Sequence, residues 1–310
     1  MIVTVTLNPA VDKTYFTGAV LTGQINRMRQ VMNIPGGKGI NVSKILRRFD
    51  KEVAATGFLG GYNGRFIEDH MREIGVMCGF THLTEETRTS INVIGNDGII
   101  TELLEPGPRI SEEQLGEFLT VFSNLVADAE LVVMSGSVAR GLPSDIYGSL
   151  ITVCKERGVR VILDSSGEAL MGGIQALPTM IKPNLKELEY VAGERLKTVE
   201  DIAQAARIIN RMGVSAVAVT MGGRGMVYVD DDESYYVSAP HVQTISTVGC
   251  GDCVTAACAI AMTDNMETQE MLRFATAVGS ANAMTMENGI IDKNILPKLQ
   301  DESAVKKLAI

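Results

Sequence analysis

Residues 246–253 read Ser246-Thr247-Val248-Gly249-Cys250-Gly251-Asp252-Cys253, and the apolar segment 254–261 follows without a break. Small or apolar residues at positions 254, 257, 258 and 261 share one face of a helix, so the segment predicts a glycine-rich turn that opens a helix. The glycines permit backbone angles closed to other residues and leave room for a ligand. Because the first N–H groups of a helix have no intrahelical partner and carry partial positive charge, this turn predicts an anion-binding site.

Asp252 stands beside this predicted anion site, and the sequence leaves two interpretations of it open. Aspartate is a common helix N-cap, so Asp252 could serve only to begin the helix. An aspartate beside a bound phosphate repels it, however, unless the carboxylate has a chemical role. Accepting a proton from an attacking hydroxyl is such a role, and it would make Asp252 a catalytic base.

The composition of the chain argues against several classes of partner. The 310 residues are 45% hydrophobic and 21% charged, as in an ordinary soluble globular protein. A net charge of −9 and a pI near 5.0 argue against a surface for nucleic acid or an anionic membrane, and no apolar run reaches the roughly 18 residues of a membrane span. The N-terminus lacks a basic segment and the five cysteines are an odd number, so we expect a cytoplasmic protein without a signal peptide.

Asp12 lies just after the first predicted strand, residues 1–7, in the segment Asn8-Pro9-Ala10-Val11-Asp12. In α/β sheets, ligands gather at the carboxyl ends of the strands. Asp12 is therefore a candidate for binding a polar ligand, and a solvated turn aspartate is the alternative.

A second glycine-rich turn, Pro35-Gly36-Gly37-Lys38-Gly39, opens a predicted helix of residues 40–49. Lys38 and Asn41 stand in or just after this turn, where their side chains can reach a ligand. The turn is not a Walker A loop, because the order G-x-x-x-x-G-K-[ST] is absent. A plain loop with a solvated lysine is the alternative interpretation.

Two strand-like regions, about 13–35 and 87–105, interrupt the pattern of the rest of the chain. The first contains short β-branched and aromatic runs separated by glycines, and the second has Asn96-Asp97-Gly98 between two β-branched runs, which is a strong hairpin signal. Neither region is followed by a long helix. We therefore predict one small antiparallel sheet, inserted in two pieces, that lies beside the main body as a lid.

From residue 53 onward, strand-like and helix-like runs alternate, which predicts a mostly parallel sheet with helices on both faces. We expect one α/β domain that spans residues 1–310. The predicted strands are 53–58, 131–134, 159–164, 179–182 and 216–220, and the predicted helices include 64–74, 111–126, 252–263 and 267–286. A hairpin of residues 226–229 and 235–237 encloses Asp230-Asp231-Asp232, which we interpret as a solvated turn in preference to a metal site.

The two glycine-rich turns together resemble the signatures of the PfkB family of carbohydrate kinases. The resemblance covers nearly all 310 residues, including the order of the strands and the two lid insertions. Three further motifs contribute to it: Asn8-Pro9 with Asp12, Lys182-Pro183-Asn184 with Glu187, and Thr220-Met221-Gly222-Gly223. Residues 6–12 and the lysine in Gly-Gly-Lys-Gly resemble the 1-phosphofructokinase and tagatose-6-phosphate kinase branch.

This resemblance implies a ribokinase-like fold with a β-sheet lid, ATP and Mg²⁺ as cofactors, and a monovalent cation as an optional third. The implied reaction is ATP-dependent phosphorylation of a ketohexose phosphate to the bisphosphate. Fructose 1-phosphate is the preferred substrate, and tagatose 6-phosphate is the alternative. Related kinases often pair through their lids, so a homodimer is one implied assembly.

By motif matching, the resemblance also assigns roles to individual residues. Asp252 would be the catalytic base, with the anion hole formed by the N–H groups of Gly249, Cys250 and Gly251. Positions matching sugar or sugar-phosphate contacts are Asp12, Gly37, Lys38, Asn41, Arg88 and Arg140. Positions matching the nucleotide site are Lys182, Asn184, Thr220, Gly222, Gly223, Arg224, Gly225 and Asn282, the last near the adenine. Glu187 would act on Mg²⁺ indirectly.

Two departures from the family pattern affect these assignments. Cys250 stands where the family usually has alanine, which is a small change in volume that leaves the backbone N–H in place. Residues 135–139 read Ser-Gly-Ser-Val-Ala where the family has Ser-Gly-Ser-Leu-Pro, so Arg140 is placed less securely than Arg88.

Two other classes of protein remain as alternatives. Cys250-Gly251-Asp252-Cys253 is a C-x-x-C at a helix N-terminus, the arrangement of disulfide oxidoreductases, although it lies late in the chain and explains none of the other glycine loops. A zinc site is weaker, because no second C-x-x-C completes four ligands. A non-catalytic sugar-phosphate sensor is the third class, and the presence of Asp252 argues against it.

Overall fold

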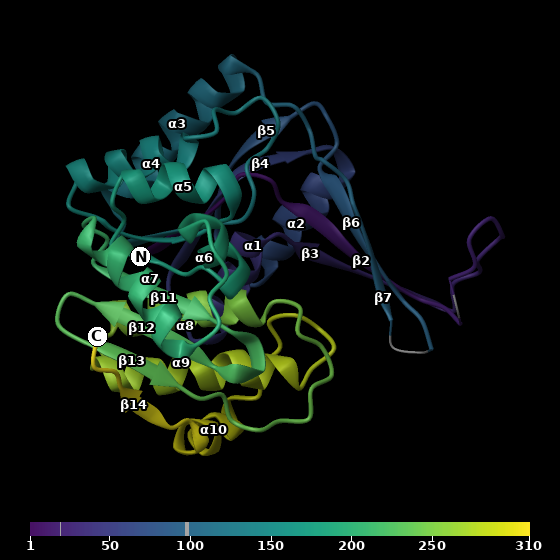
Figure 1. The fold of residues 1–310 in the computed structure, drawn as a ribbon. Helices are drawn as coiled ribbons and strands as arrows, with labels where there is room; N and C mark the ends of the chain where they lie inside the picture. The colour runs from purple at the N-terminus through teal and green to yellow at the C-terminus, as the bar shows by residue number, and fades with distance from the viewer. Residues whose placement is uncertain (19, 97–98) are drawn as a thin grey trace.

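The structure is a computed structural model, and it describes residues 1–18, 20–96 and 99–310. Within these residues a ten-stranded sheet forms the centre of the molecule (Figure 1). Its strands are β1 (Ile2–Thr6), β4 (Val53–Gly60), β5 (Met77–Leu83), β8 (Leu131–Ser135), β9 (Arg160–Asp164), β10 (Met180–Ile181), β11 (Ala216–Thr220), β12 (Met226–Asp230), β13 (Ser234–Val237) and β14 (Val305–Lys307).

The order across this sheet is β14-β13-β12-β11-β10-β9-β8-β1-β4-β5. Strands β11 through β5 pair in parallel, and β12, β13 and β14 extend one edge in antiparallel pairs. The mostly parallel sheet is therefore as predicted, and the hairpin of β12 and β13 is also confirmed.

Helices cover both faces of the sheet, as predicted. The bounds are α1 (Lys38–Arg48), α2 (Gly61–Glu73), α3 (Glu112–Ala127), α4 (Ile146–Glu156), α5 (Gly167–Gln175), α6 (Leu185–Ala192), α7 (Val199–Arg211), α8 (Cys250–Thr263), α9 (Thr268–Ala283) and α10 (Leu296–Glu302). Helices α1, α2, α8, α9 and α10 supply the core on one face, and α3 to α7 supply it on the other. Because side chains alternate along a strand, Ile2 belongs to the first core while Val3 and Val5 belong to the second. No helix among the described residues is long and apolar enough to span a membrane.

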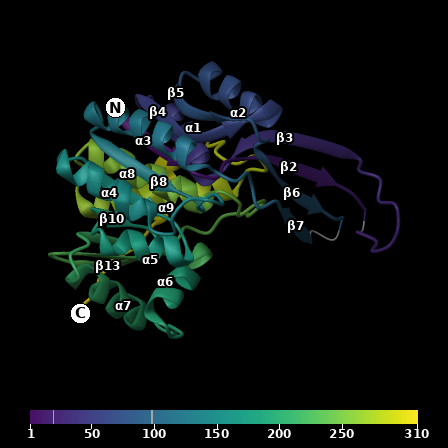
Figure 2. The same ribbon diagram turned by 90° about the horizontal axis from the view of Figure 1, so that it is seen from above.

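A separate four-stranded sheet projects from this body (Figures 1 and 2). Its order is β3-β2-β6-β7, formed by β2 (Ala10–Phe16), β3 (Gln30–Gly36), β6 (Arg88–Ile94) and β7 (Ile100–Leu104). The two insertions thus form one small sheet, as predicted, but β2 and β6 pair in parallel, so the sheet is mixed and not antiparallel throughout. The predicted turn residues Asp97 and Gly98 lie outside the described residues.

The first insertion begins earlier than expected, at Ala10, because β1 leads almost directly into β2. Asp12 therefore lies inside a strand and not in a turn, opposite Ile34 of β3 and Ser90 of β6. Its neighbours on both sides are fixed by the sheet. A solvated turn is thus excluded for this side chain.

Candidate active site

A cavity of about 490 Å³ opens at the edge of the central sheet where the parallel strands end. Strands β9 and β11 contribute their last residues, Asp164 and Thr220, and helix α8 contributes its first turn. The predicted site residues that line it are Lys38, Lys182, Asn184, Thr220, Gly222, Gly223, Gly225, Gly249, Cys250, Gly251 and Asp252. Segments far apart in the sequence therefore meet where an α/β sheet usually binds its ligand.

We name the turn before α8, residues 246–251, the anion turn. Within the described residues the N–H groups of Gly249 and Gly251 have no hydrogen-bond partner, and that of Cys250 donates to the Thr247 carbonyl at 3.4 Å. Gly249 is the N-cap, with φ 76° and ψ −2°, a left-handed conformation that glycine adopts at little cost. No side chain caps this helix, so the N–H groups of its first turn have no side-chain acceptor. Asp252 lies inside the helix, past the N-cap, and the interpretation of Asp252 as a helix cap is wrong.

Asp252 is buried, with 6% of its surface exposed, and its Oδ2 accepts a hydrogen bond of 2.8 Å from Nδ2 of Asn41. Burial raises its pKa to about 6, and the nearby Asp164 carboxylate adds to the rise, while Lys38, Asn41 and Lys182 oppose it. A carboxyl group with a pKa near neutrality can accept a proton and later release it. The environment of Asp252 thus suits a general base.

Asp164, which the sequence interpretation treated only as the end of a strand, is the central anion of the cavity. Its buried carboxylate accepts from Lys38 Nζ at 2.8 Å and from Thr255 Oγ1 at 2.9 Å, and Lys182 Nζ lies 3.3 Å away. Burial works to raise the pKa of Asp164, but Lys182 and Lys38 outweigh it and hold the pKa below its usual value. Its place at the carboxyl end of a parallel strand was the signal that could have identified it.

Lys38 contacts the acidic side of the cavity. Besides its bond to Asp164, its Nζ lies 3.8 Å from Oε1 of Glu187. Burial alone would lower the pKa of Lys38, yet Asp164 and Glu187 raise it well above its usual value, so the ammonium stays charged. Glu187 is held in place by a capping box with Asn184 at the start of α6, with bonds of 2.7 and 2.9 Å.

The remaining nucleotide-loop residues differ in how they meet the cavity. Gly222 and Gly223 have open space where a Cβ would stand, whereas Arg224 is exposed and does not line the cavity. Asn282 is also outside the lining: its Nδ2 donates to the Val248 carbonyl at 2.9 Å and its Oδ1 accepts from the Gly289 N–H at 2.8 Å. Asn282 therefore ties the turn before α8 to the loop after α9.

Asp12 and Asn41 are the predicted sugar-binding residues at the base of the small sheet, and Asn41 contacts Asp252. Burial raises the pKa of Asp12 to about 6, against the opposing charges of Lys44 and Arg88. Asn41 is 4% exposed, and its Oδ1 has no hydrogen-bond partner among the described residues. Gly36 makes room for Asp12, because a Cβ there would lie 2.1 Å from Oδ2. Gly37 lies in the same turn.

The two arginines bond to one short segment, residues 105–107. Arg88 donates to the carbonyls of Asn8 (3.2 Å) and Glu105 (3.1 Å). Arg140 donates to the Gly107 carbonyl from both Nε (3.0 Å) and one terminal nitrogen (2.6 Å). The structure therefore brings Arg88 and Arg140 together, while Lys38 is paired across the cavity with Asp164.

Comparison with known proteins identifies the family. The model of the pfkB family of carbohydrate kinases matches residues 5–290. The chain belongs to this family. The 1-phosphofructokinase of Bacillus subtilis (strain 168) is 34% identical over 302 residues, which cover 97% of this chain and 99% of that protein.

Solved structures give the same result. The tetrameric inhibited form of phosphofructokinase-2 from Escherichia coli has a TM-score of 0.88 and 28% identity, covering 97% of this chain and 98% of that one. A possible 1-phosphofructokinase from Thermotoga maritima has a TM-score of 0.90 and 26% identity over the full length of both chains. The protein is thus a sugar-phosphate kinase of the PfkB family with the ribokinase-like fold.

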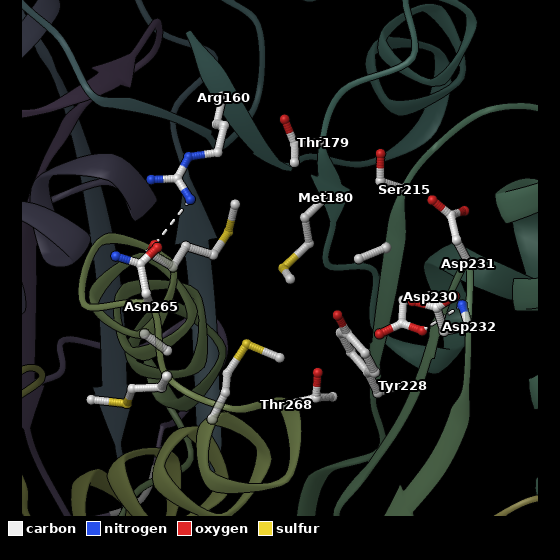
Figure 3. Close-up of a pocket in the computed structure, with 15 residues that line it drawn as sticks. Arg160, Thr179, Met180, Ser215, Tyr228, Asp230, Asp231, Asp232, Asn265 and Thr268 are labelled. Carbon is white, nitrogen blue, oxygen red and sulfur yellow. Dashed lines mark hydrogen bonds between the residues drawn. The ribbon is translucent and has the colours of Figure 1, made fainter.

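A second cavity, of about 460 Å³, lies at the opposite edge of the sheet, where the parallel strands begin (Figure 3). Arg160, Thr179 and Ser215 reach it from the starts of β9 to β11, and none of the predicted site residues line it. The acidic triplet 230–232 stands at its side, where Oδ1 of Asp230 accepts from the N–H groups of Asp232 and Glu233. Among the described residues no group of three or more acidic, histidine or cysteine side chains is placed to hold a metal ion. Asp230 is the last residue of β12, and Asp231 and Asp232 lie in the connection to β13.

The C-x-x-C pair lacks the properties of a redox site. Cys250 is half-buried and Cys253 is fully buried, and both are free thiols. Burial raises the pKa of each thiol, with Asp252 adding to the rise. The reactive cysteine of a disulfide oxidoreductase needs a lowered pKa, so that the thiolate forms. The raised pKa values of Cys250 and Cys253 therefore argue against the redox alternative, as does the match to the kinase family.

Proposed function

We propose that this kinase transfers the γ-phosphoryl group of ATP to the 6-hydroxyl of fructose 1-phosphate and yields fructose 1,6-bisphosphate. The observation that carries the proposal is the buried Asp252 carboxyl beside an uncapped helix N-terminus, in a cavity that also holds Lys38 and Lys182. The 34% identity to a 1-phosphofructokinase supports this sugar phosphate in particular.

In this mechanism Asp252 accepts the proton of the sugar hydroxyl as its oxygen attacks the γ-phosphorus, and ADP leaves with the bridging oxygen. The N–H groups of Gly249, Cys250 and Gly251 hold the oxygens of the transferred group. Lys182 and Lys38 offset its negative charge. The lid closes over the sugar and excludes water, which would otherwise accept the phosphoryl group.

The residues of the cavity fit magnesium bound through ATP. Mg²⁺ usually keeps only one or two protein carboxylates, together with phosphate oxygens and water. Asp164 supplies one carboxylate in the cavity, and Glu187 lies just outside the lining, 3.8 Å from the same Lys38 ammonium that bonds to Asp164. When bound, the ion neutralises phosphate charge; we assign Glu187 an indirect role.

The acceptor end would hold the sugar through hydrogen bonds to Asp12 and the free Oδ1 of Asn41. Arg88 and Arg140 would bind its phosphate, each exchanging a carbonyl partner for charge-assisted bonds. Lys38 then serves the transferred phosphoryl group more directly than the sugar phosphate, because its ammonium is paired with Asp164.

A monovalent cation is a further proposed activator, since the phosphofructokinase-2 of Escherichia coli has been solved in complex with potassium. The loop after α9 offers peptide carbonyl oxygens, which are suitable ligands for such ions. Asn282 hydrogen-bonds this loop to the turn before α8. Replacing potassium by lithium at constant ionic strength should lower turnover; equal rates would remove the cation from the proposal.

We also propose a homodimer formed through the lid, in the cytoplasm. The lid exposes apolar side chains on strands and loops, among them Leu21, Ile25, Val31, Leu103 and Leu104. A monomer rarely leaves so many together in water. Light scattering should give twice the monomer mass for the parent and a monomer for a double variant with Val31→Glu and Leu103→Glu; a monomeric parent contradicts the dimer.

A substrate panel tests the proposed reaction. Purified enzyme with ATP and Mg²⁺ should release ADP fastest with fructose 1-phosphate, more slowly with tagatose 6-phosphate, and hardly at all with fructose. A preference for tagatose 6-phosphate would reassign the substrate within the same chemistry. ATP left intact with every sugar phosphate would favour a sensor, and reduction of insulin disulfides would favour a redox protein.

A further inference from the structure

A third cavity, which we name the α1–α2 cavity, lies on the far side of the anion turn. It has a volume of about 450 Å³ and is lined by Asn33, Ile34, Pro35, Lys44, Arg47, Arg48, Phe66, His70, Ile74, Glu287, Asn288 and Gly289. None of these residues lines the active-site cavity. It is therefore a separate space, and the proposed phosphoryl transfer assigns it no role.

The charges around the α1–α2 cavity are mostly positive. Lys44, Arg47 and Arg48 lie three and four positions apart, so they share one face of α1, and His70 faces them from the last turn of α2. Glu287 is the one acid in the lining. In a chain with a net charge of −9, this concentration of cations favours an anionic ligand.

The cationic side chains differ in how many hydrogen bonds they already make within the protein. Lys44 Nζ donates to the Pro35 carbonyl at 3.0 Å, and Arg47 donates to the carbonyls of Ile74 and Lys51 at 3.1 and 2.7 Å. Within the described residues Arg48 makes no hydrogen bond or ion pair, and it is exposed. Arg48 therefore has its whole guanidinium available for a ligand.

Asn288 is the second observation that points to a ligand. It is 7% exposed, lines the cavity, and its Oδ1 has no hydrogen-bond partner in the described part of the chain. Buried amides are normally hydrogen-bonded, so an unpaired one requires an explanation. Its Oδ1 lies against Gly249 and is closed to the cavity, so the side-chain nitrogen of Asn288, which makes no hydrogen bond within the described residues, is the group left for a ligand.

Asn288 lies between the α1–α2 cavity and the turn before α8. A Cβ on Gly249 would lie 1.6 Å from Oδ1 of Asn288, so the two residues are in direct contact. The next N–H, that of Gly289, donates to Asn282, whose amide nitrogen donates to the Val248 carbonyl. A molecule in the α1–α2 cavity therefore touches the loop on which Gly249 rests.

We propose that the α1–α2 cavity binds a small phosphate monoester and that Arg48, with Lys44 and His70, holds its phosphate. Arginine suits this task because its planar fork pairs with two phosphate oxygens at once. Ile34, Phe66 and Ile74 provide an apolar wall for the organic part of the ligand. A volume of about 450 Å³ is in the range of small-molecule sites.

Titration calorimetry with phenyl phosphate tests the site without any turnover, so its result is independent of the proposed reaction. The parent should bind with a dissociation constant in the millimolar range or below. Arg48→Glu should weaken binding at least tenfold, because it replaces a charge-assisted contact by repulsion. Arg48 is exposed, so the variant should keep the parent's thermal unfolding temperature.

Two matched variants make the test specific. Arg211→Glu changes the same charge in the last turn of another helix, α7, and should alter binding less than twofold. Arg88→Ala removes a proposed sugar-phosphate contact and should also leave it unchanged. No binding by the parent up to 20 mM, equal losses in Arg48→Glu and Arg211→Glu, or loss in Arg88→Ala with none in Arg48→Glu would each overturn the proposal.

Discussion

The glycine-rich turns that open α1 and α8 look alike in sequence, but their glycines differ in what a side chain at each position would contact. In the α1 turn the glycines are required by packing against β1. A Cβ on Gly39 would lie 2.3 Å from Oγ1 of Thr6 and 2.7 Å from the carbonyl oxygen of Val5. A Cβ on Gly37 would lie 3.0 Å from the Thr6 side chain and 3.1 Å from the Pro9 backbone.

In the α8 turn only Gly251 leaves open space, whereas Gly249 is required by its backbone angle and by packing against Asn288. A Cβ on Gly251 would meet only Lys182 Nζ, at 3.5 Å, which is an ordinary contact. Gly249 combines a left-handed backbone with the contact to Asn288. The glycines of the α1 turn are thus required by close packing, whereas the α8 turn combines close packing at Gly249 with open space at Gly251. The same signature serves two structural needs.

The largest effect is expected at Asp252, where the two ends meet. Asp252→Asn keeps the shape and leaves the Asn41 contact almost unchanged, but it removes the base. Turnover should fall about 10²-fold or more, with little change in ATP affinity. Steady-state kinetics and nucleotide titration measure the two quantities. A turnover within a few-fold of the parent would reduce Asp252 to a structural residue.

At the acceptor end, Arg88→Ala should raise the KM for the sugar phosphate by about one to two orders of magnitude, because a charge-assisted bond contributes roughly 1.5–3 kcal/mol. The KM for ATP should change little, since Arg88 does not line the cavity in which we propose that ATP binds. Arg29→Ala is the control, because within the described residues the side chain of Arg29, another arginine of the small sheet region, bonds only to Asn96. Equal weakening of both substrates would contradict the assignment.

A glycine-to-alanine substitution in each turn distinguishes a glycine needed for close packing from one that leaves room for a ligand. Gly39→Ala should lower the free energy of unfolding by about 2–3 kcal/mol, because its Cβ overlaps the backbone of β1. Gly251→Ala should keep or slightly raise stability but lower turnover about tenfold, because its methyl group stands where the phosphoryl group passes. Chemical denaturation and kinetics of both variants test this; a stable Gly39→Ala or a fully active Gly251→Ala would remove the distinction.

The layout of the fold was predictable because local patterns and glycine signatures carry it. Strand–helix alternation predicted the parallel sheet, and the two β-rich insertions predicted the lid. Strand β5 was missed, because Gly79 and His82 interrupt its apolar pattern. Strand β14 was also missed, since three residues with two exposed lysines give no strand signal.

The electrostatic partners in the site were less predictable. The position of Asp164 at the end of β9 was a usable signal. Its partners Lys38 and Lys182 were not predictable, because they lie far apart in the sequence, at the start of α1 and just after β10. Lys38 was expected to face the sugar phosphate, and only the folded chain shows it paired with Asp164. Likewise, no pattern near Asn282 indicates that its amide joins two loops instead of lining the cavity. The roles themselves stay predictions.

Activity and stability should respond to pH in opposite directions. Asp252 and Asp12 both have pKa values raised to about 6 by burial, so each binds a proton more tightly in the folded state than in the unfolded state. The contribution of Asp252 to stability should therefore rise by about 2 kcal/mol as pH falls from 7 towards 4. Asp164, whose pKa is lowered, opposes this rise only as pH approaches and passes below the usual aspartate value. Turnover should fall through the same range, since the base becomes protonated. Asp252→Asn should flatten the stability profile, and an unchanged slope would contradict the raised pKa.

The smallest effect is expected at Cys250, in the same turn. Its Sγ has only weak partners, the Ser246 carbonyl at 3.9 Å and the Asn282 amide at 3.5 Å, and the turn uses its backbone N–H. Cys250→Ala should therefore keep turnover within about twofold and the free energy of unfolding within roughly 1 kcal/mol.

Sensitivity to oxidation is a sharper test of the Cys250→Ala variant. Because burial raises the pKa of the thiol, hydrogen peroxide should inactivate the parent slowly at pH 7 and faster as pH rises and thiolate forms. ATP should slow the loss, since Cys250 lines the nucleotide cavity and an added oxygen would crowd the anion turn. Cys250→Ala should resist the oxidant over the same period. If it loses activity as fast as the parent, the damage lies at another residue and the α8 turn tolerates a larger side chain than its open geometry indicates.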